Sequence, residues 1–352
     1  MRSFPLLSPV LVALLALACE PVAEGGTQGA QGAQGGSLAL NQSTQGSGAQ
    51  IEATPQSAEL RAFVYPEEME LMVDWTIQTT NIQGTLERYR ETFQSDGLGN
   101  MRLDVTGFSP DLVQPFQAPT SDQALDYENR MRFMVQYRNL HVRAFHAARL
   151  NYRWVEDANL VQVAGIDCIR TRAISKHGHG DFEILSDAQT DLVLGWTKFA
   201  PNGSVSMKLE ATAVNLAPNL NGVVWSAPVV GETEYSMHQQ HMLTFEPATP
   251  QYLPAGFYEE EAWLRFSAGL FPGMSDMLVT LYSDGLQLLF VAQHGQSTMG
   301  TQLKLLNRAT EVRQYDLGGV RVAEGLVGKR KFYVASMMSL DEITTVFGSL
   351  LD

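Results

Sequence analysis

Residues 69–80 read MELMVDWTIQTT, and the alternation within this stretch decides the fold class of the chain. Apolar Trp75 and Ile77 alternate with polar Thr76 and Gln78. A period of two residues is typical of a β-strand with one buried face. We therefore expect this stretch to be a strand of a half-buried sheet.

Two further strands follow and are joined by a turn. Residues 95–100 read SDGLGN, and Asp-Gly is a strong hairpin signal. The arms of the predicted hairpin are residues 85–94, where the alternation is weak, and residues 101–106. Turn-forming residues separate six more predicted strands, so the pattern indicates a mostly antiparallel sheet. These strands are residues 151–155, 160–165, 168–175, 181–186, 192–199 and 205–214.

A helix is expected at about residues 121–149, where apolar residues recur at loosely helical spacing. Residues 133–142 within it also fit an alternating strand. The C-terminal part predicts strands at 277–282, 286–292 and 331–337. A final helix begins at Ser339, a good N-cap with Glu342 at the capping-box position.

The N-terminus predicts export and a lipid anchor. Residues 1–18 have a short basic start and an apolar segment, as a secretory signal peptide has. The Ala16-Leu17-Ala18-Cys19 segment resembles the lipobox of bacterial lipoproteins, in which the cysteine is lipidated. The alternative is an ordinary cleaved signal peptide. We expect lipidated Cys19 to begin a disordered Gly/Gln/Ser tether over residues 19–57. Glu20 after the cysteine favours the outer membrane over the inner one, by resemblance to enteric sorting.

Composition excludes some function classes. The 352 residues carry a net charge of −14, which argues against nucleic-acid binding because that needs a basic face. The two cysteines form no disulfide framework. Cys168 lies in an apolar-flanked run and is expected to be a buried small hydrophobic residue, with a reactive thiol as the alternative.

Candidate chemistry in the sequence is sparse. No nucleophile elbow, P-loop, zinc-protease motif or dinucleotide fingerprint is present, so we predict no enzyme activity, catalytic residue or cofactor. His177 with His179, and His238 with His241, are too few for a metal site, which needs three or four ligands. We therefore predict no metal. The acidic run at residues 259–261 is expected to be a solvated face, or alternatively to meet a basic partner patch.

Several short blocks, in order along the chain, are similar to motifs of one family. Residues 151–152 (NY), 163–165 (VAG) and 186–192 (SDAQTDL) are similar to the pattern NY…VAG…D…TGL. Asp191 stands where glycine is usual in that pattern. Residues 252–257 (YLPAGF) are similar to LPxGF.

The most specific block is Tyr282-Ser283-Asp284-Gly285-Leu286, which is similar to the motif YSDGL. Taken in order, the blocks resemble the RseB/MucB family of periplasmic sigma-E factor regulators. The resemblance implies an α+β fold. Its large domain is a strongly curved antiparallel sheet, a half-open barrel similar to the lipoprotein carriers LolA and LolB, with covering helices. A smaller α+β C-terminal domain follows.

The implied organisation is a half-barrel domain at 58–222, a linker at 223–239 and a small domain at 240–352. The implied function is a non-catalytic envelope lipoprotein on the periplasmic side of a bacterial membrane. It would bind the periplasmic part of an anti-sigma factor, and a lipid or lipopolysaccharide, to regulate a stress response. The alternative is a periplasmic carrier of lipids or lipoproteins. The candidate ligand-facing residues are Trp75, Tyr89, Phe93, Met101 and Leu103, which are otherwise ordinary sheet core.

Overall fold

The computed structural model describes residues 61–80, 84–121, 141–225, 232–243, 245–265, 277–295, 312–317, 320–327 and 330–350. The predicted signal peptide, Cys19 and the tether lie outside these residues, and their assignment stays a prediction. Within the described ranges, no helix has both the length and the apolar character that crossing a bilayer requires.

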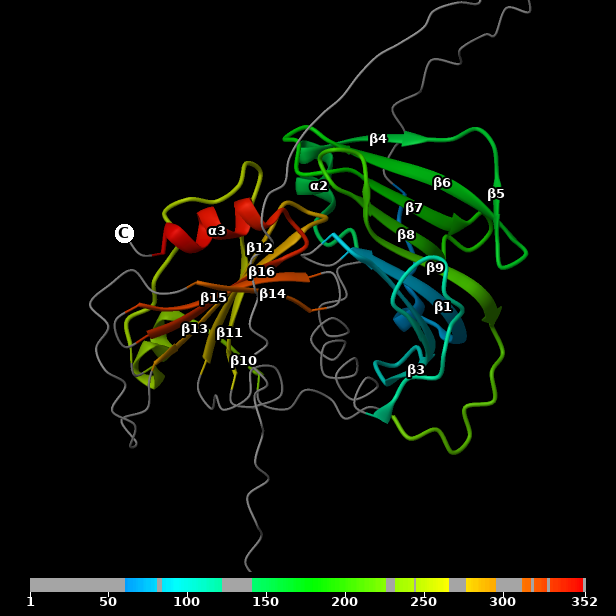
Figure 1. Cartoon of the computed structure of the whole chain (residues 1–352), viewed down its shortest axis with the longest axis horizontal. Helices are drawn as coiled ribbons and strands as arrows, with labels where there is room; N and C mark the ends of the chain where they lie inside the picture. Colours follow the sequence, from blue (N-terminus) through cyan, green and yellow to red (C-terminus); the bar gives the residue numbers. More distant parts are fainter. Residues whose placement is uncertain are drawn as a thin grey trace, which may run out of the picture. The chain divides into compact units, whose positions relative to one another are not determined.

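The first sheet is antiparallel and open. Its strand order is β3-β2-β1-β9-β8-β7-β6-β4, with β5 beside β6, so β3 and β4 stand at opposite ends (Figure 1). Strand β1 thus lies between β2 and the much later β9. The strands are β1 (Glu70–Thr80), β2 (Leu86–Asp96), β3 (Met101–Ser109), β4 (Tyr152–Glu156), β5 (Val161–Val163), β6 (Ile166–Ser175), β7 (Phe182–Asp187), β8 (Val193–Phe199) and β9 (Val205–Asn215).

The expected alternation in β1 is confirmed. Trp75 and Ile77 are buried, whereas Thr76 and Gln78 are partly exposed. Register shifts interrupt four strand pairs of this sheet, and such bulges bend a strand and increase its twist. The sheet is therefore a curved antiparallel sheet, as the family resemblance implies.

One bulky residue occupies a backbone position that favours glycine. Asp191 has a φ of 60°, in the left-handed region. This explains why the family pattern has glycine there, because a side chain at this φ costs about 1 kcal/mol. An ion pair at 2.8 Å between the Arg61 guanidinium and the Asp191 carboxylate helps to hold the residue in place.

The second sheet is also antiparallel, in the order β10-β11-β12-β13-β16-β15-β14. Helix α3 (Leu340–Gly348) packs on one face of it, and the Ser339 side chain accepts a hydrogen bond from the Glu342 amide, as the predicted cap requires (Figure 1). The strands are β10 (Glu232–Glu234), β11 (Tyr258–Arg265), β12 (Met277–Ser283), β13 (Leu288–Gly295), β14 (Arg313–Leu317), β15 (Val320–Val327) and β16 (Arg330–Ser336).

The two sheets share one hydrophobic core. The face of the second sheet that carries Leu288 and Phe290 joins the same buried cluster as Trp75 and Trp196 of the first sheet. Strand β10 lies within the predicted linker 223–239 but pairs with β11. The proposed domain boundaries stay a prediction.

The helix expected at 121–149 agrees with the structure at Ser121, which is helical, and differs from it at the C-terminal end. Only Phe145–Asn151 is helical there, as α2, and residues 122–140 lie outside the described residues. Ala144 is extended, and the Arg143 amide donates a hydrogen bond to the Gly285 carbonyl at 3.1 Å. This bond to another part of the chain replaces a helical one. Two short 3-10 helices, η1 (Pro66–Glu68) and η2 (Met237–Met242), complete the described elements.

Candidate functional site

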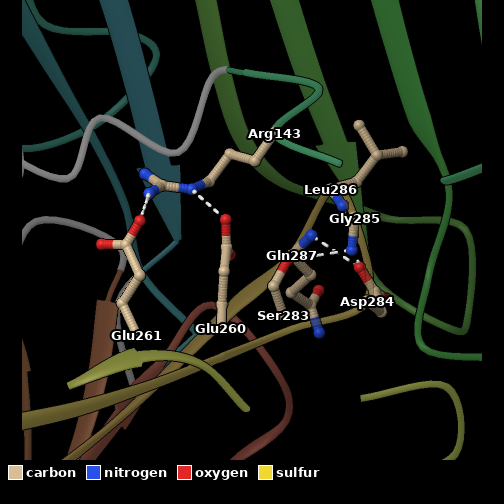
Figure 2. Close-up of polar contacts among 8 residues, drawn as sticks. All are labelled: Arg143, Glu260, Glu261, Ser283, Asp284, Gly285, Leu286 and Gln287. Carbon is tan, nitrogen blue, oxygen red and sulfur yellow. Dashed lines mark hydrogen bonds and ion pairs between the residues drawn. The ribbon is translucent and has the colours of Figure 1, made fainter. Parts of the chain in front are cut away.

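A tight turn between β12 and β13 is fully buried and closes on itself. The Asp284 carboxylate oxygen Oδ1 accepts hydrogen bonds from the backbone amides of Leu286 at 3.0 Å and Gln287 at 2.7 Å (Figure 2). The Ser283 hydroxyl accepts one from the Gly285 amide at 2.9 Å. An Asp side chain that binds amides two and three residues later is a standard turn former. The YSDGL motif therefore specifies this turn.

The turn is held by the residues where α2 meets β4. The Tyr152 hydroxyl donates to Asp284 Oδ2 at 2.6 Å, and the Asn151 amide nitrogen donates to the Asp284 carbonyl at 2.9 Å. The same Asn151 nitrogen donates to the Gly256 carbonyl at 3.1 Å. Three separate sequence blocks, which contain Asn151-Tyr152, Gly256 and Asp284, thus meet at one place. We call the set Asn151, Tyr152, Gly256 and Ser283–Gln287 the joint.

Two glycines allow the joint to close. Gly285 has a φ of +101°, and a Cβ there would lie 2.4 Å from the Ala148 backbone nitrogen. Gly256 has a φ of +86°, and a Cβ there would lie 2.5 Å from Asn151 Oδ1. Both positions combine a left-handed backbone with close contact. A side chain at 285 would force α2 or the turn to move, and one at 256 would displace the Asn151 side chain.

The His177–His179 pair, for which no metal is predicted, makes hydrogen bonds to other parts of the chain. His177 Nε2 lies 3.0 Å from Asn151 Oδ1, and His179 Nε2 donates to the Ala255 carbonyl at 2.9 Å. The two rings thus link the β6–β7 turn to the joint. Across the part of the chain that the structure describes, no group of three or more potential metal ligands is found.

The acidic run at residues 259–261 is not a uniformly solvated face. It lies in β11, where a register shift between Glu259 and Glu261 interrupts the pairing with β12, and the Glu260 side chain is only 17% exposed. Arg143 Nε binds the Glu260 carboxylate at 3.2 Å, and its guanidinium also reaches Glu261 at 3.9 Å (Figure 2). The basic partner of this run therefore lies within the chain, beside the joint.

Burial controls the ionisation of two side chains, Tyr152 in the joint and Lys198 in β8. Burial and the Asp284 carboxylate raise the pKa of Tyr152 well above its ordinary value, so its hydroxyl stays a hydrogen-bond donor. Burial lowers the pKa of Lys198, in β8, to about 7. Asp284 opposes this shift, and Arg321 adds to it.

The low pKa of Lys198 predicts that stability rises with pH. Between pH 7 and the ordinary lysine pKa of 10.5, the unfolded chain binds this proton more strongly than the folded chain does. Raising the pH therefore removes a penalty on folding. From pH 7 to about pH 9, the free energy of unfolding should rise by about 2 kcal/mol more in the wild type than in Lys198→Met.

Urea denaturation in Tris buffers at matched ionic strength measures this difference. Lys208→Met is the matched control, because Lys208 lies on the neighbouring strand but is paired with Glu210 at the surface. Its pH profile should follow the wild type. A wild-type profile parallel to that of Lys198→Met would show that the Lys198 ammonium is not destabilised by burial.

The candidate ligand-facing residues share one face of β1–β3. Trp75, Tyr89 and Phe93 are buried, and Met101 and Leu103 are partly buried against them. Whether they contact a ligand stays a prediction.

Sequence reasoning missed the continuation of this face. It runs on through the buried residues Phe182 of β7 and Trp196 and Lys198 of β8. Phe182 pairs with Lys198, and Trp196 pairs with Ile184. Only the non-local pairing of β1 with β9 brings the two halves together, and no local signal reports it.

Cys168 is buried, as predicted, and unpaired. Burial, reinforced by Asp187, raises the pKa of its thiol to about 11, so the reactive thiolate is disfavoured at neutral pH. The alternative of a reactive cysteine therefore has no support from its surroundings.

The fold and the joint define a class of α+β protein in which two antiparallel sheets share a core and a motif-bearing turn connects them. No family model and no curated protein matches the chain. Solved structures of MucB are similar, each with a TM-score of 0.44 and 15% sequence identity. MucB in complex with MucA(peri) covers 82% of this chain and 93% of its own. The Pseudomonas aeruginosa MucA/MucB complex covers 80% and 92%, and MucB alone 81% and 92%.

Proposed function

We propose that this chain is a non-catalytic regulator of the bacterial envelope that binds a protein partner of the anti-sigma-factor type. In this proposal it is a lipoprotein on the periplasmic side of the outer membrane and acts in an envelope stress response. MucB has been crystallised with MucA(peri), and a periplasmic segment of that kind is the partner we propose.

The observation that carries the proposal is the convergence of the motif blocks at the joint. The blocks that resemble the regulator family contain Asn151, Gly256 and Asp284, and the Asn151 side chain donates to the carbonyls of both other residues. These hydrogen bonds hold two sheets together, and a binding surface needs rigid support of this kind. The motifs thus specify a fixed relation between the sheets, which a partner that spans both would require.

Co-purification from detergent-solubilised membranes tests the proposed partner. The full chain should enrich a membrane-embedded anti-sigma factor. Deletion of the gene that encodes the full chain should change the envelope stress response. Gly285→Ala, which disrupts the joint, should enrich less of that factor than the wild type does. An unchanged stress response and no enriched anti-sigma factor would rule out this function.

The proposed lipid anchor gives a separate expectation. Cys19→Ser should move the protein from the membrane fraction to the soluble periplasmic fraction, because the thiol that carries the lipid is lost. Cys168→Ser is the matched control and should leave the protein in the membrane fraction, since Cys168 is buried. Fractionation followed by immunoblotting measures both. Retention of Cys19→Ser in the membrane would argue against lipidation at this residue.

A carrier of lipids or lipoproteins is the second candidate function. It is favoured by the buried indole nitrogens of Trp75 and Trp196, which have no hydrogen-bond partner among the described residues. Buried indole N–H groups usually find an acceptor, and an acyl ester or headgroup would supply one. Native mass spectrometry of the full chain should then show bound acyl species, with less bound to a Trp75→Phe, Trp196→Phe double variant. Equal loading of both proteins would remove this support.

A further inference from the structure

One side of α2 is exposed to solvent and carries two large apolar residues. Phe145 is 40% exposed and Leu150 is 60% exposed. His146 and Arg149, which lie between them in the sequence, are also exposed. Residues four apart on a helix are neighbours, so Phe145 stands beside Arg149. In the same way His146 stands beside Leu150. The helix therefore presents apolar and basic side chains together, on the side that faces away from the core.

A lysine from the β6–β7 turn lies against the C-terminal end of this helix. Lys176 Nζ donates to the carbonyl of Arg149 at 3.0 Å and to that of Leu150 at 2.8 Å. An α-helix leaves its last carbonyls without a helical partner, and a cation is stabilised there. Lys176 is exposed, so its charge faces solvent while these two bonds hold it beside Arg149.

Strand β4 adds a third cation on the same side. Arg153 pairs in register with Ile174, and the Lys176 amide donates to the Asn151 carbonyl at 2.9 Å, which continues the pairing of β4 with β6. Arg153 and Lys176 are therefore diagonal neighbours on one face of the sheet, with Cβ atoms about 7 Å apart. Arg153 is exposed as well. We call the following set the basic face: Phe145, His146, Arg149, Leu150, Arg153 and Lys176.

The arginines and the lysine of the basic face form no ion pair within the described chain. By contrast, Arg170 and Arg172, further along β6, each pair with Glu183 at 3.4 Å. Asp181, at the end of the β6–β7 turn, accepts a hydrogen bond from the Ser175 amide at 2.9 Å. The whole chain has a net charge of −14, but salt screens exposed charges over about 8 Å. A ligand that touches this face therefore meets an excess of positive charge.

We propose that the basic face binds the surface of a lipid bilayer that contains anionic phospholipids. Its three cations lie at the lipid phosphates, and Phe145 and Leu150 reach the boundary of the acyl chains. Helices that lie in a membrane interface combine cations and apolar side chains in this way. An acidic protein segment would match the cations alone, so the exposed apolar pair favours the bilayer.

The proposed lipid anchor makes this contact effective even when it is weak. Lipidated Cys19 keeps the domain near the bilayer, and tethering raises the local concentration for a second contact. An acyl anchor with a basic patch is a known pair of membrane signals. The basic face then sets which side of the domain faces the membrane. This role rests on the proposed function, but the contact itself is tested without the anchor, so either can fail alone.

Flotation with lipid vesicles tests the contact. The parent protein is residues 19–352 with Cys19→Ser, which lacks the predicted leader and the lipid but contains every described element. The vesicles are either pure phosphatidylcholine or an equal mixture of phosphatidylcholine and phosphatidylglycerol. We expect binding to the mixed vesicles only. Added sodium chloride should weaken it, because salt screens exposed charges.

The double variant Arg149→Gln, Arg153→Gln should bind the mixed vesicles about 30-fold more weakly than the parent, because each cation near an anionic lipid surface strengthens binding about fivefold. The matched control is Arg102→Gln, Lys208→Gln. It removes two positive charges from the same sheet, where both are paired with carboxylates. Its binding should match that of the parent.

A second double variant, Phe145→Ser, Leu150→Ser, keeps every charge and tests the apolar pair. It should bind the mixed vesicles about tenfold more weakly, because two apolar side chains no longer leave water. The control is Leu98→Ser, in the β2–β3 turn, where the leucine is 87% exposed. This control should bind as the parent does.

Three results would overturn the proposal. One is that the parent does not bind the mixed vesicles, or binds both kinds equally. Another is equal binding by the arginine variant and its control. The third is equal binding by the Phe145/Leu150 variant and the parent, which would mean that the cations act alone. Binding of soluble poly-L-glutamate would then indicate an acidic protein partner in place of the bilayer.

Discussion

Replacing Asp284 with alanine should destabilise the protein by about 4 kcal/mol, since removing one partner from a buried charged network usually costs about 3–5 kcal/mol. The change removes the acceptor for the Tyr152 hydroxyl and for two turn amides. It also removes the only anion whose field on Lys198 is resolved within the described chain. Urea denaturation of the full chain at pH 7 measures the loss.

The chain contains a matched control for this change. Asp111 Oδ1 accepts from the amides of Val113 at 2.8 Å and Gln114 at 2.7 Å, the same pattern that Asp284 makes. That turn is exposed to solvent, so water can replace the lost carboxylate. Asp111→Ala should therefore cost only a small fraction of the loss in Asp284→Ala. Similar losses in the two variants would mean that the turn pattern matters and the burial of Asp284 does not.

Replacing Gly285 with alanine should destabilise the protein by about 3 kcal/mol or more, because strain and overlap add. The new Cβ would lie 2.4 Å from the Ala148 nitrogen and 2.9 Å from its Cα, both of which are backbone atoms. Neither can turn aside as a flexible side chain would, so α2 or the turn must move. The hydrogen bond from the Arg143 amide to the Gly285 carbonyl would be disturbed by the same shift.

Gly178→Ala separates backbone strain from this overlap. Gly178 also has a positive φ, +79°, but a Cβ there meets no atom within 4 Å. Its replacement should cost about 1 kcal/mol, the strain contribution alone. Thermal unfolding of both variants beside the wild type gives the comparison. Equal losses would show that the close approach of the turn to α2 is not what makes glycine necessary at 285.

The parts of the fold that depend on neighbouring residues could be predicted from the sequence. The period of two residues in β1 reports its buried side directly, because Trp75 and Ile77 differ from their immediate neighbours. The cap of α3 is likewise local, since Ser339 and Glu342 are three residues apart. Strand β15 was missed. It contains Gly325, which weakens a strand signal but makes room for the Phe347 ring of α3.

The joint could be predicted only in part. The family resemblance selected its motif residues, but the contact between Asn151 and Asp284 joins positions 133 residues apart. Short sequence motifs do not encode a contact between residues so far apart along the chain. Lys198 gave no signal, because a lysine near the end of a strand usually lies in solvent. Its burial depends on the core that the two sheets share, to which its register partner Phe182 belongs.

The pairing of β1 with β9 has a consequence for how the chain acquires its structure. Trp75 pairs with Ala211, so the second neighbour of β1 is made only after the rest of this sheet has been synthesised. Until then the β1–β3 meander presents an unpaired edge that carries large apolar side chains. Contacts between remote segments slow folding, and open strand edges invite aggregation. We therefore expect slow folding, with a need for chaperones until residues 205–215 are available to pair with β1.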